Sequence, residues 1–269
     1  MTLFTPHGHL VPLHQFRDLL RQGADPNEVW HGIRNGEPVW HLPLIQAARS
    51  ADELGYLRLL IDHEHTDLEV ADMECRTALH LATAHGNVDA VRLLLHAGAA
   101  IDTPDTYGAT ALHYACNTVE DKPLLLLLEA GANPNARNLG GYTPLLETLK
   151  SYSTWPKPYE DKVALLLRHG ARVNDAEPQY GYTPLYAAAA NGWARITTML
   201  LMAGANPRAK IGNGERPVDA VLRQLAIGAG RKDPALRATY AALVAHDRKG
   251  LLACVEQMAR RMEHMRRAM

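Results

Sequence analysis

The sequence has few of the features on which secreted, membrane-spanning or zinc-dependent proteins rely. Its three cysteines, Cys75, Cys116 and Cys254, lie far apart without paired spacing, so neither a disulfide framework nor a zinc site is indicated. No apolar run approaches the roughly 18 residues of a membrane span, and the N-terminus shows no basic-then-apolar signal pattern. We therefore expect a cytoplasmic protein that does not bind membranes.

The chain also lacks an excess of charge and the motifs of common catalytic sites. A net charge of -1 over 269 residues favours neither nucleic acid nor an anionic surface as a partner. There is no His-Glu-x-x-His, Gly-x-Ser-x-Gly, Gly-x-Gly-x-x-Gly or Gly-Lys-Ser/Thr pattern. The nearest approach to a metal site is His63-Glu64-His65, which has no third ligand at a known spacing. We predict no catalysis, no cofactor and no metal.

What the sequence contains instead is a repeat. Thr77, Thr110 and Thr143 stand 33 residues apart, and Thr183 opens a fourth similar segment. A glycine follows three of these threonines after 21 residues, at positions 98, 131 and 204. Spacing held in this way predicts a stack of small units instead of one large core.

Each mark of the repeat has a physical reason. A threonine hydroxyl can cap a free backbone N–H at a helix start, and Pro144 or Pro184 at the next position loses no hydrogen bond. The glycine supplies the left-handed residue that ends a second helix. We therefore predict that first helices start at residues 77, 110, 143 and 183, and that each is followed by a second helix.

The segments 77–82, 110–115, 143–146 and 183–188 resemble the Thr-Pro-Leu-His-x-Ala signature of the ankyrin repeat, a unit of a β-turn and two antiparallel helices. The resemblance implies an all-α ankyrin-repeat solenoid over residues 1–230. Its predicted units are a half-repeat (1–33), a degenerate repeat (34–73), four clear repeats (74–106, 107–139, 140–179 and 180–212) and a degenerate repeat (213–230). Residues 231–269 are expected to form a helical extension or cap.

The signature histidine implies a structural role for His80 and His113. In the family this imidazole ties the turn to the helix by hydrogen bonds. Leu146 and Tyr186 replace it in the next two repeats, where we expect the turns to be held less firmly. A further consequence of the resemblance is that turn tips and first helices form a concave groove that binds another protein.

Large rigid aromatic side chains are good anchors in such a groove. Most of the Tyr and Trp residues lie between residues 107 and 193, and two insertions carry more. The expected partner-binding residues are Tyr107, Tyr114, Tyr142, Trp155, Tyr159, Tyr180, Tyr182 and Trp193, together with Trp30 and Trp40. The alternative is that Gly-Tyr-Thr-Pro is an ordinary turn, in which case Tyr142 and Tyr182 carry no information about binding.

Two insertions interrupt the period. In the first, residues 151–160, Trp155 either covers a neighbouring repeat or contacts the partner. In the second, Asn35-Gly36 is a hairpin-turn signal flanked by Trp30 and Trp40. We expect a hairpin whose tryptophans pack on each other, whereas outward-pointing tryptophans would be further anchors.

The C-terminal region departs from the repeat. Asp233-Pro234 predicts a helix over 235–245, and a second helix is expected from about residue 251 to the end. Its apolar residues share one face: Leu251, Val255, Met258, Met262, Met265 and Met269. The favoured role is a cap on the last repeat, and the alternative is a partner or dimer helix.

These observations predict a non-enzymatic module that binds, and inhibits or neutralises, one protein. A bacterial immunity or antitoxin protein is an example, since the excess of Arg over Lys indicates a bacterial source. We expect a monomer that forms a heteromeric complex with its partner and binds no nucleic acid. The alternatives are an adaptor that bridges two partners and a small-molecule enzyme that uses the 151–160 loop.

Overall fold

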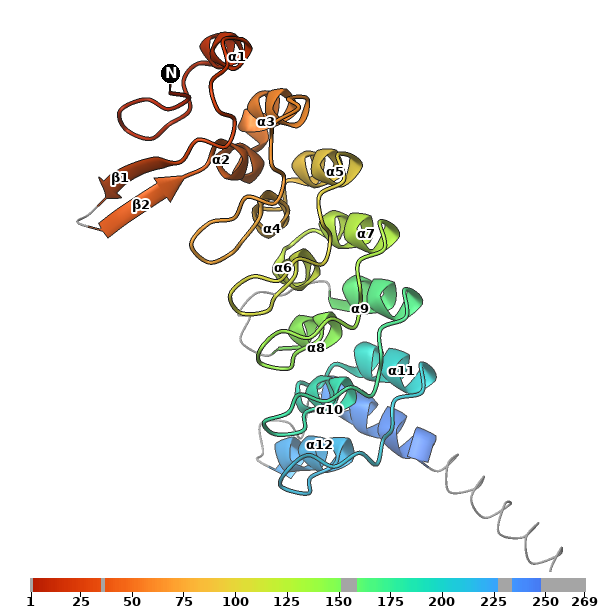
Figure 1. Ribbon diagram of the computed structural model, residues 1–269. Helices are drawn as coiled ribbons and strands as arrows, with labels where there is room; N and C mark the ends of the chain where they lie inside the picture. The colour runs from red at the N-terminus through yellow and green to blue at the C-terminus, as the bar shows by residue number, and fades with distance from the viewer. Residues whose placement is uncertain (1, 35–36, 151–158, 227–233, 248–269) are drawn as a thin grey trace, which may run out of the picture. The chain divides into compact units, whose positions relative to one another are not determined.

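The computed structural model describes residues 2–34, 37–150, 159–226 and 234–247 (Figure 1). The described chain is built from short helices joined by turns, with one β-hairpin. It divides into two compact parts, Met1–Glu147 and Thr148–Met269, and each is considered by itself.

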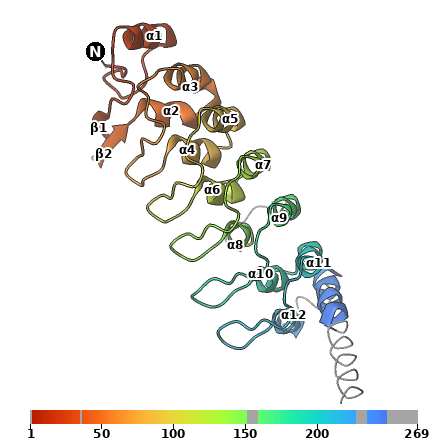
Figure 2. The ribbon, with the colours of Figure 1, turned by 45° about the vertical axis from the view of Figure 1, so that its right-hand side comes forward.

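The first part is a double row of helices (Figures 1 and 2). First helices of successive units contact one another, as do second helices, and each first helix packs on its own second helix. The leucines between the two rows are fully buried, for example Leu57, Leu94 and Leu112. The elements are α1 (Leu13–Arg21), α2 (Pro43–Arg49), η1 (Ala51–Glu53), α3 (Leu54–Ile61), α4 (Ala78–Ala84), α5 (Val88–His96), α6 (Ala111–Asn117), α7 (Lys122–Glu129) and the start of α8 (Pro144–Thr148).

A two-stranded antiparallel hairpin, β1 (Trp30–Arg34) and β2 (Glu37–His41), lies between α1 and α2. It takes the place that a short turn has in the following units. The hairpin predicted from Asn35-Gly36 is therefore confirmed by the pairing of the strands on either side of these two residues.

The second part repeats the helix pairing. Helix α10 (Pro184–Ala190) contacts α11 (Ala194–Met202) and α12 (Pro217–Ala226), and α11 contacts α9 (Tyr159–Arg168). A helix over residues 234–247 confirms the one predicted from Asp233-Pro234. Its Leu236 approaches Gly192 so closely that a Cβ there would lie 2.9 Å from Leu236 Cδ2. The predicted Met-faced helix beyond residue 251, and Trp155, lie outside the described residues.

The predicted helix starts are confirmed. Thr77, Thr110 and Thr183 are the N-cap residues of α4, α6 and α10, and Thr143 directly precedes α8. The Thr183 hydroxyl accepts a hydrogen bond from the backbone N–H of Tyr186 at 3.2 Å. The glycines at 98, 131, 170 and 204 all have positive φ after their second helices, as predicted for left-handed helix ends.

His80 shows how one unit is fastened to the next. Its Nδ1 accepts the backbone N–H of Thr77 at 3.1 Å, and its Nε2 lies 3.1 Å from the carbonyl oxygen of Ala109. Because Nδ1 is an acceptor, the ring is neutral. Its proton is on Nε2, which donates a hydrogen bond to the carbonyl oxygen of Ala109. His113 makes the same two bonds, with Thr110 and Tyr142. The predicted structural role is confirmed, and the bond reaches the turn of the following unit.

Tyr186 stands at the position of the signature histidine, and the predicted loosening at this unit is wrong. Its hydroxyl donates to Glu215 Oε2 at 2.9 Å, and Glu215 lies 29 residues further on, the same separation as between His80 and Ala109. Burial, followed by this hydrogen bond, raises the pKa of Tyr186 to about 12. The phenol is longer than an imidazole and reaches a carboxylate in place of a backbone carbonyl.

Cys75 is the one described non-glycine residue with a positive φ, at 57°. It stands two residues before Thr77, where the later units have Gly108, Gly141 and Gly181 with φ between 71° and 74°. A Cβ in this left-handed region meets the neighbouring carbonyl oxygen and costs about 1 kcal/mol or more. The turn before α4 therefore retains backbone strain that its counterparts avoid.

We expect Cys75→Gly to raise the free energy of unfolding by about 1 kcal/mol at most, because relief of strain exceeds the added freedom of glycine in the unfolded chain. Urea unfolding followed by circular dichroism measures this change. Cys75→Ala is the control, since it removes the thiol but keeps the Cβ, and its stability should stay near that of the wild type. An equal gain in both variants would show that the thiol, and not the backbone, is responsible.

The buried imidazole of His80 predicts a pH dependence. Desolvation lowers the pKa of His80 below its ordinary 6.5, while the bond to Ala109 and the charge of Asp105 oppose this shift. A depressed folded-state pKa contributes stability that is present above the unfolded pKa and is lost as the pH falls below it. We expect the free energy of unfolding to decrease from pH 7 to pH 5, with a shallower slope in His80→Gln. The exposed His96→Gln is the control, and a slope equally reduced there would contradict the assignment.

Candidate protein-binding surface

Each turn that precedes a first helix is organised by one side chain. Asp105 Oδ1 accepts the backbone N–H groups of Tyr107 and Ala109, both at 2.8 Å. Asp72 accepts two turn N–H groups in its own unit, and Glu177 accepts three. These acceptors satisfy the donors that a tight turn leaves without a partner, which fixes the turn backbone.

Neighbouring turns of the first part are also bonded to each other. The N–H of Thr106 donates to the carbonyl oxygen of Glu74 at 2.9 Å, and the N–H of Leu139 donates to that of Tyr107 at 2.8 Å. Gly108 permits this approach, because a Cβ there would come within 2.9 Å of the Leu139 nitrogen. The turn tips are therefore held in a fixed row.

A large apolar side chain is exposed at each position along this row. We call the set the apolar tip row: Trp40 on β2 is 52% exposed, and Met73, Tyr107 and Leu139 on the next three turns are 58%, 67% and 80% exposed. Both views of the ribbon show the hairpin and these turns projecting from the same side of the first part (Figures 1 and 2). Exposed apolar side chains gathered on one surface are typical of interaction sites.

Two members of the apolar tip row, Trp40 and Tyr107, were among the predicted partner-binding residues, whereas Met73 and Leu139 were not. Neither is aromatic, so residue type alone does not single them out. A signal was present, because Met73 and Leu139 each stand four residues before the threonine that opens the next helix. This shared register is the signal in the sequence that relates the two residues.

The hairpin places its two tryptophans on opposite faces, so the expectation that they pack on each other is wrong. Trp30 pairs with His41, and Trp40 pairs with His31, with ring centroids 5.3 Å apart in both pairs. In this register residue 30 pairs with residue 41 and residue 40 pairs with residue 31, and successive residues of a strand point to opposite faces. Trp30 lies against Gly32, where an added Cβ would come within 1.8 Å of the indole.

Other predicted aromatic residues serve the fold. The Tyr114 hydroxyl donates to Asp105 Oδ2 at 2.7 Å, and burial together with this bond raises the pKa of Tyr114 well above its ordinary value. Tyr142 and Trp193 are half-buried, the latter at the N-cap of α11. Tyr159 begins α9, but its side chain lies outside the described set, as does Trp155.

In the second part, three tyrosines come together at the turn before α10. Tyr182 stacks on Tyr186 with ring centroids 5.0 Å apart and planes at 14°, and Tyr180 lies 5.5 Å from Tyr182. Tyr180 is half exposed, whereas Tyr186 is buried. Of the two predicted residues, Tyr180 presents its ring to the outside and Tyr182 supports it.

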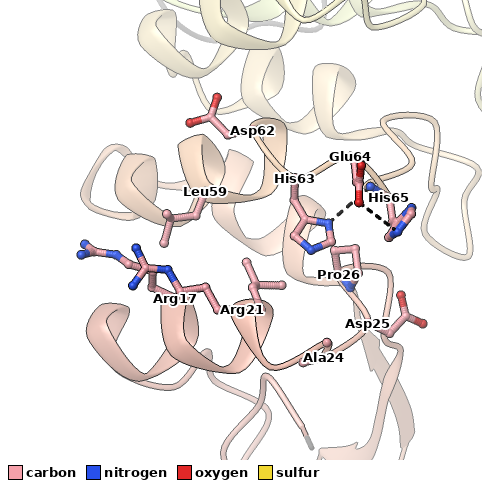
Figure 3. A pocket seen from close by; sticks show the side chains of 12 residues that line it. Arg17, Arg21, Ala24, Asp25, Pro26, Leu59, Asp62, His63, Glu64 and His65 are labelled. Atoms are coloured by element: carbon pink, nitrogen blue, oxygen red, sulfur yellow. Dashed lines mark hydrogen bonds and ion pairs between the residues drawn. The ribbon is translucent and has the colours of Figure 1, made fainter.

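A separate cleft of about 820 Å³ lies between α1, α3 and the loops that follow them. Figure 3 shows Arg17 and Arg21 toward one end and His63 toward the other. His65 lies 3.4 Å from Glu64, and both side chains are largely exposed, at 75% and 84%. No group of three His, Cys, Asp or Glu side chains in the described ranges is placed to hold a metal ion. Nor does any described helix have the length and apolar character needed to cross a bilayer.

The family comparison agrees with this architecture. A family model described as ankyrin repeats in three copies matches residues 16–105, 44–138 and 122–211. The mouse B-cell lymphoma 3 protein homolog is 32% identical over 215 residues, which are 78% of this chain and 45% of that protein. The Drosophila tyrosine-protein kinase Shark is 30% identical over 133 residues, which are 49% of this chain and 13% of the kinase. This chain thus spans less than half of either relative.

Among solved structures, the ankyrin repeat domain of Bcl-3, a unique member of the IkappaB protein family, is similar with a TM-score of 0.62 and 27% identity. The similarity covers 77% of this chain and 86% of that one. The two curated relatives named above are animal proteins, and the bacterial source inferred from composition stays a prediction. The helix pairs, the capped turns and the match across residues 16–211 show that this chain belongs to the ankyrin-repeat family.

Proposed function

We propose that this protein binds one specific protein partner through its turn tips and concave face, and that it inhibits or neutralises that partner by covering part of its surface. The observation that carries the proposal is the apolar tip row. Side chains such as Trp40 and Tyr107 expose large apolar areas to water, which is unfavourable. Burial of these areas against a partner would therefore stabilise the complex.

The rigidity of the turns adds to this argument. The backbone N–H groups of Tyr107 and Ala109 are bonded to Asp105, and the carbonyl oxygen of Tyr107 is bonded to Leu139. A surface already ordered in the free protein loses little conformational entropy when it binds. The tips are therefore suited to tight association without rearrangement.

The comparisons support an interaction role. The solved structure of Bcl-3 to which this chain is similar is that of the ankyrin repeat domain. The similarity covers 77% of this chain. Inhibition of the partner, as by an immunity or antitoxin protein, is the favoured consequence of binding. An adaptor that bridges two partners, and an enzyme that uses residues 151–160, make different predictions in the same experiment.

We expect the tagged protein to retain one stoichiometric partner when it is isolated from its own cells, and the double variant Trp40→Ala/Tyr107→Ala to lose it. Each truncation of a central anchor should weaken binding by about 2 kcal/mol, or roughly thirtyfold. Val119→Ala is the matched control, because Val119 is 74% exposed but lies after α6, away from the tips. Circular dichroism establishes that all variants are folded.

The activity of the captured partner, measured with and without this protein, then tests inhibition. Loss of activity on binding would support the neutralising role, whereas two proteins held simultaneously would favour the adaptor. A partner retained by the double variant at full affinity would contradict the proposed surface. Turnover of a small molecule by the purified chain would support the enzyme alternative.

A further inference from the structure

Two turns of the first part carry a negative charge that the composition of the whole chain conceals. Residues 62–77 and 97–110, which include these turns, contain eight carboxylates and one arginine, a net charge of -7. The complete chain carries only -1 with histidines counted as neutral, so the remainder is net positive. Charge of one sign concentrated beside an exposed surface influences which partners can approach it.

The single arginine of these segments leaves most of this charge uncompensated. Arg76 donates from Nε and Nη2 to Asp72 Oδ2, at 2.9 and 2.7 Å, and from Nη2 to Glu74 Oε2 at 3.2 Å. Arg76 is therefore already paired with two of the eight carboxylates. No other lysine or arginine lies in these two segments to balance the six remaining carboxylates.

Several of these carboxylates are held in place by neutral donors. Glu69 accepts the backbone N–H of Ala100 at 2.7 Å, and Asp102 accepts that of Asn133 at 3.1 Å. Asp105 accepts two turn N–H groups and the Tyr114 hydroxyl. Such bonds fix the position of a carboxylate, but a neutral donor does not cancel its charge.

Part of this charge lies on the turns of two members of the apolar tip row, whereas the turn of Leu139 has Arg137 and no carboxylate. Met73 stands between Asp72 and Glu74, and Tyr107 stands two residues after Asp105. Asp105 is buried, and Asp72 and Glu74 share Arg76, so a partner that covers Met73 meets the charge of the half-exposed Glu74. Acidic proteins, nucleic acids and anionic membranes would be repelled, whereas lysine and arginine side chains would find complementary charge.

We infer that the partner binds the apolar tip row through a basic segment, in which lysine or arginine side chains accompany exposed apolar ones. This inference rests on the proposed function and adds the chemistry of the partner. The apolar side chains cover Trp40, Met73, Tyr107 and Leu139, and the cations pair with exposed carboxylates of the two acidic segments, such as Glu69 and Glu74. The negative field also accelerates the approach of such a segment at low salt.

The test measures the binding of four short fluorescein-labelled peptides to the full chain by fluorescence anisotropy. The peptides combine basic or acidic residues with either Leu and Trp or Ser. The basic peptide with Leu and Trp should bind at least about tenfold more tightly than each of the other three. Its binding should weaken as sodium chloride is raised. Equal affinity for the acidic apolar peptide would overturn the inference.

Variants of the chain test where the basic apolar peptide binds. Glu69→Gln/Glu74→Gln removes two exposed charges with little change of shape, and it should weaken binding of the basic apolar peptide about tenfold. Glu129→Gln, an exposed carboxylate at the end of α7, is the matched control and should leave it unchanged. Equal weakening in both would show attraction to overall charge and would overturn the inference.

The inference and the proposed function fail in distinguishable ways. If the cellular partner is lost in Trp40→Ala/Tyr107→Ala while the basic apolar peptide binds no better than the acidic one, the tips bind a protein of other chemistry. In that case the inference is wrong and the proposed function stands. If neither the partner nor the peptide depends on Trp40 and Tyr107, both are wrong.

Discussion

The arrangement of the repeats depends on a side chain, present in three of them, that joins the head of a first helix to the turn of the following repeat. His80 makes this bond to Ala109, and Tyr186 makes it to Glu215. Helices of seven to ten residues such as these are too short to be stable alone in water. Packing between neighbours supplies most of the stabilisation, and the side-chain bond determines where the next turn lies relative to that packing.

The consequence is that the turn backbone needs nothing from the residues at its tip. Ala109 is bonded through both its N–H, to Asp105, and its carbonyl oxygen, to His80. Tyr107 contributes only backbone atoms to this arrangement, and its side chain is 67% exposed. The residues that maintain the fold thus differ from those that a partner would meet, so tip side chains can vary without loss of the repeat.

Much of the fold follows from the sequence because its marks act locally. A threonine at a helix start and a glycine after a helix end have the same physical effect wherever they occur, and the starts at Thr77, Thr110 and Thr183 were predicted correctly. Tyr186 was misjudged because its effect is not local: the acceptor, Glu215, lies in another repeat. The sequence pattern shows that the histidine is missing, but not that a longer side chain reaches a different acceptor.

The candidate site was harder to predict for the same reason. Whether Trp30 and Trp40 face each other depends on an offset of one residue in the strand register, which the hairpin signal alone does not specify. Tyr114 resembles a surface anchor in the sequence, yet a single bond to Asp105 holds it within the fold. Residue type indicates what a side chain can do, whereas its hydrogen-bond partner decides which of these roles it takes.

Asp72 and Asp105 connect the fold to recognition. Each organises a turn by accepting backbone N–H groups, and each also places a negative charge beside an exposed apolar side chain. A turn could not easily exchange such an aspartate for a basic residue, because lysine and arginine have no acceptor to offer the N–H groups. The way in which these turns are built thus excludes a basic residue at this position, although the neutral Asn138 accepts a turn N–H in the same way as Asp105. The apolar side chains at the tips are free of that constraint, and selection for a particular partner can act on them.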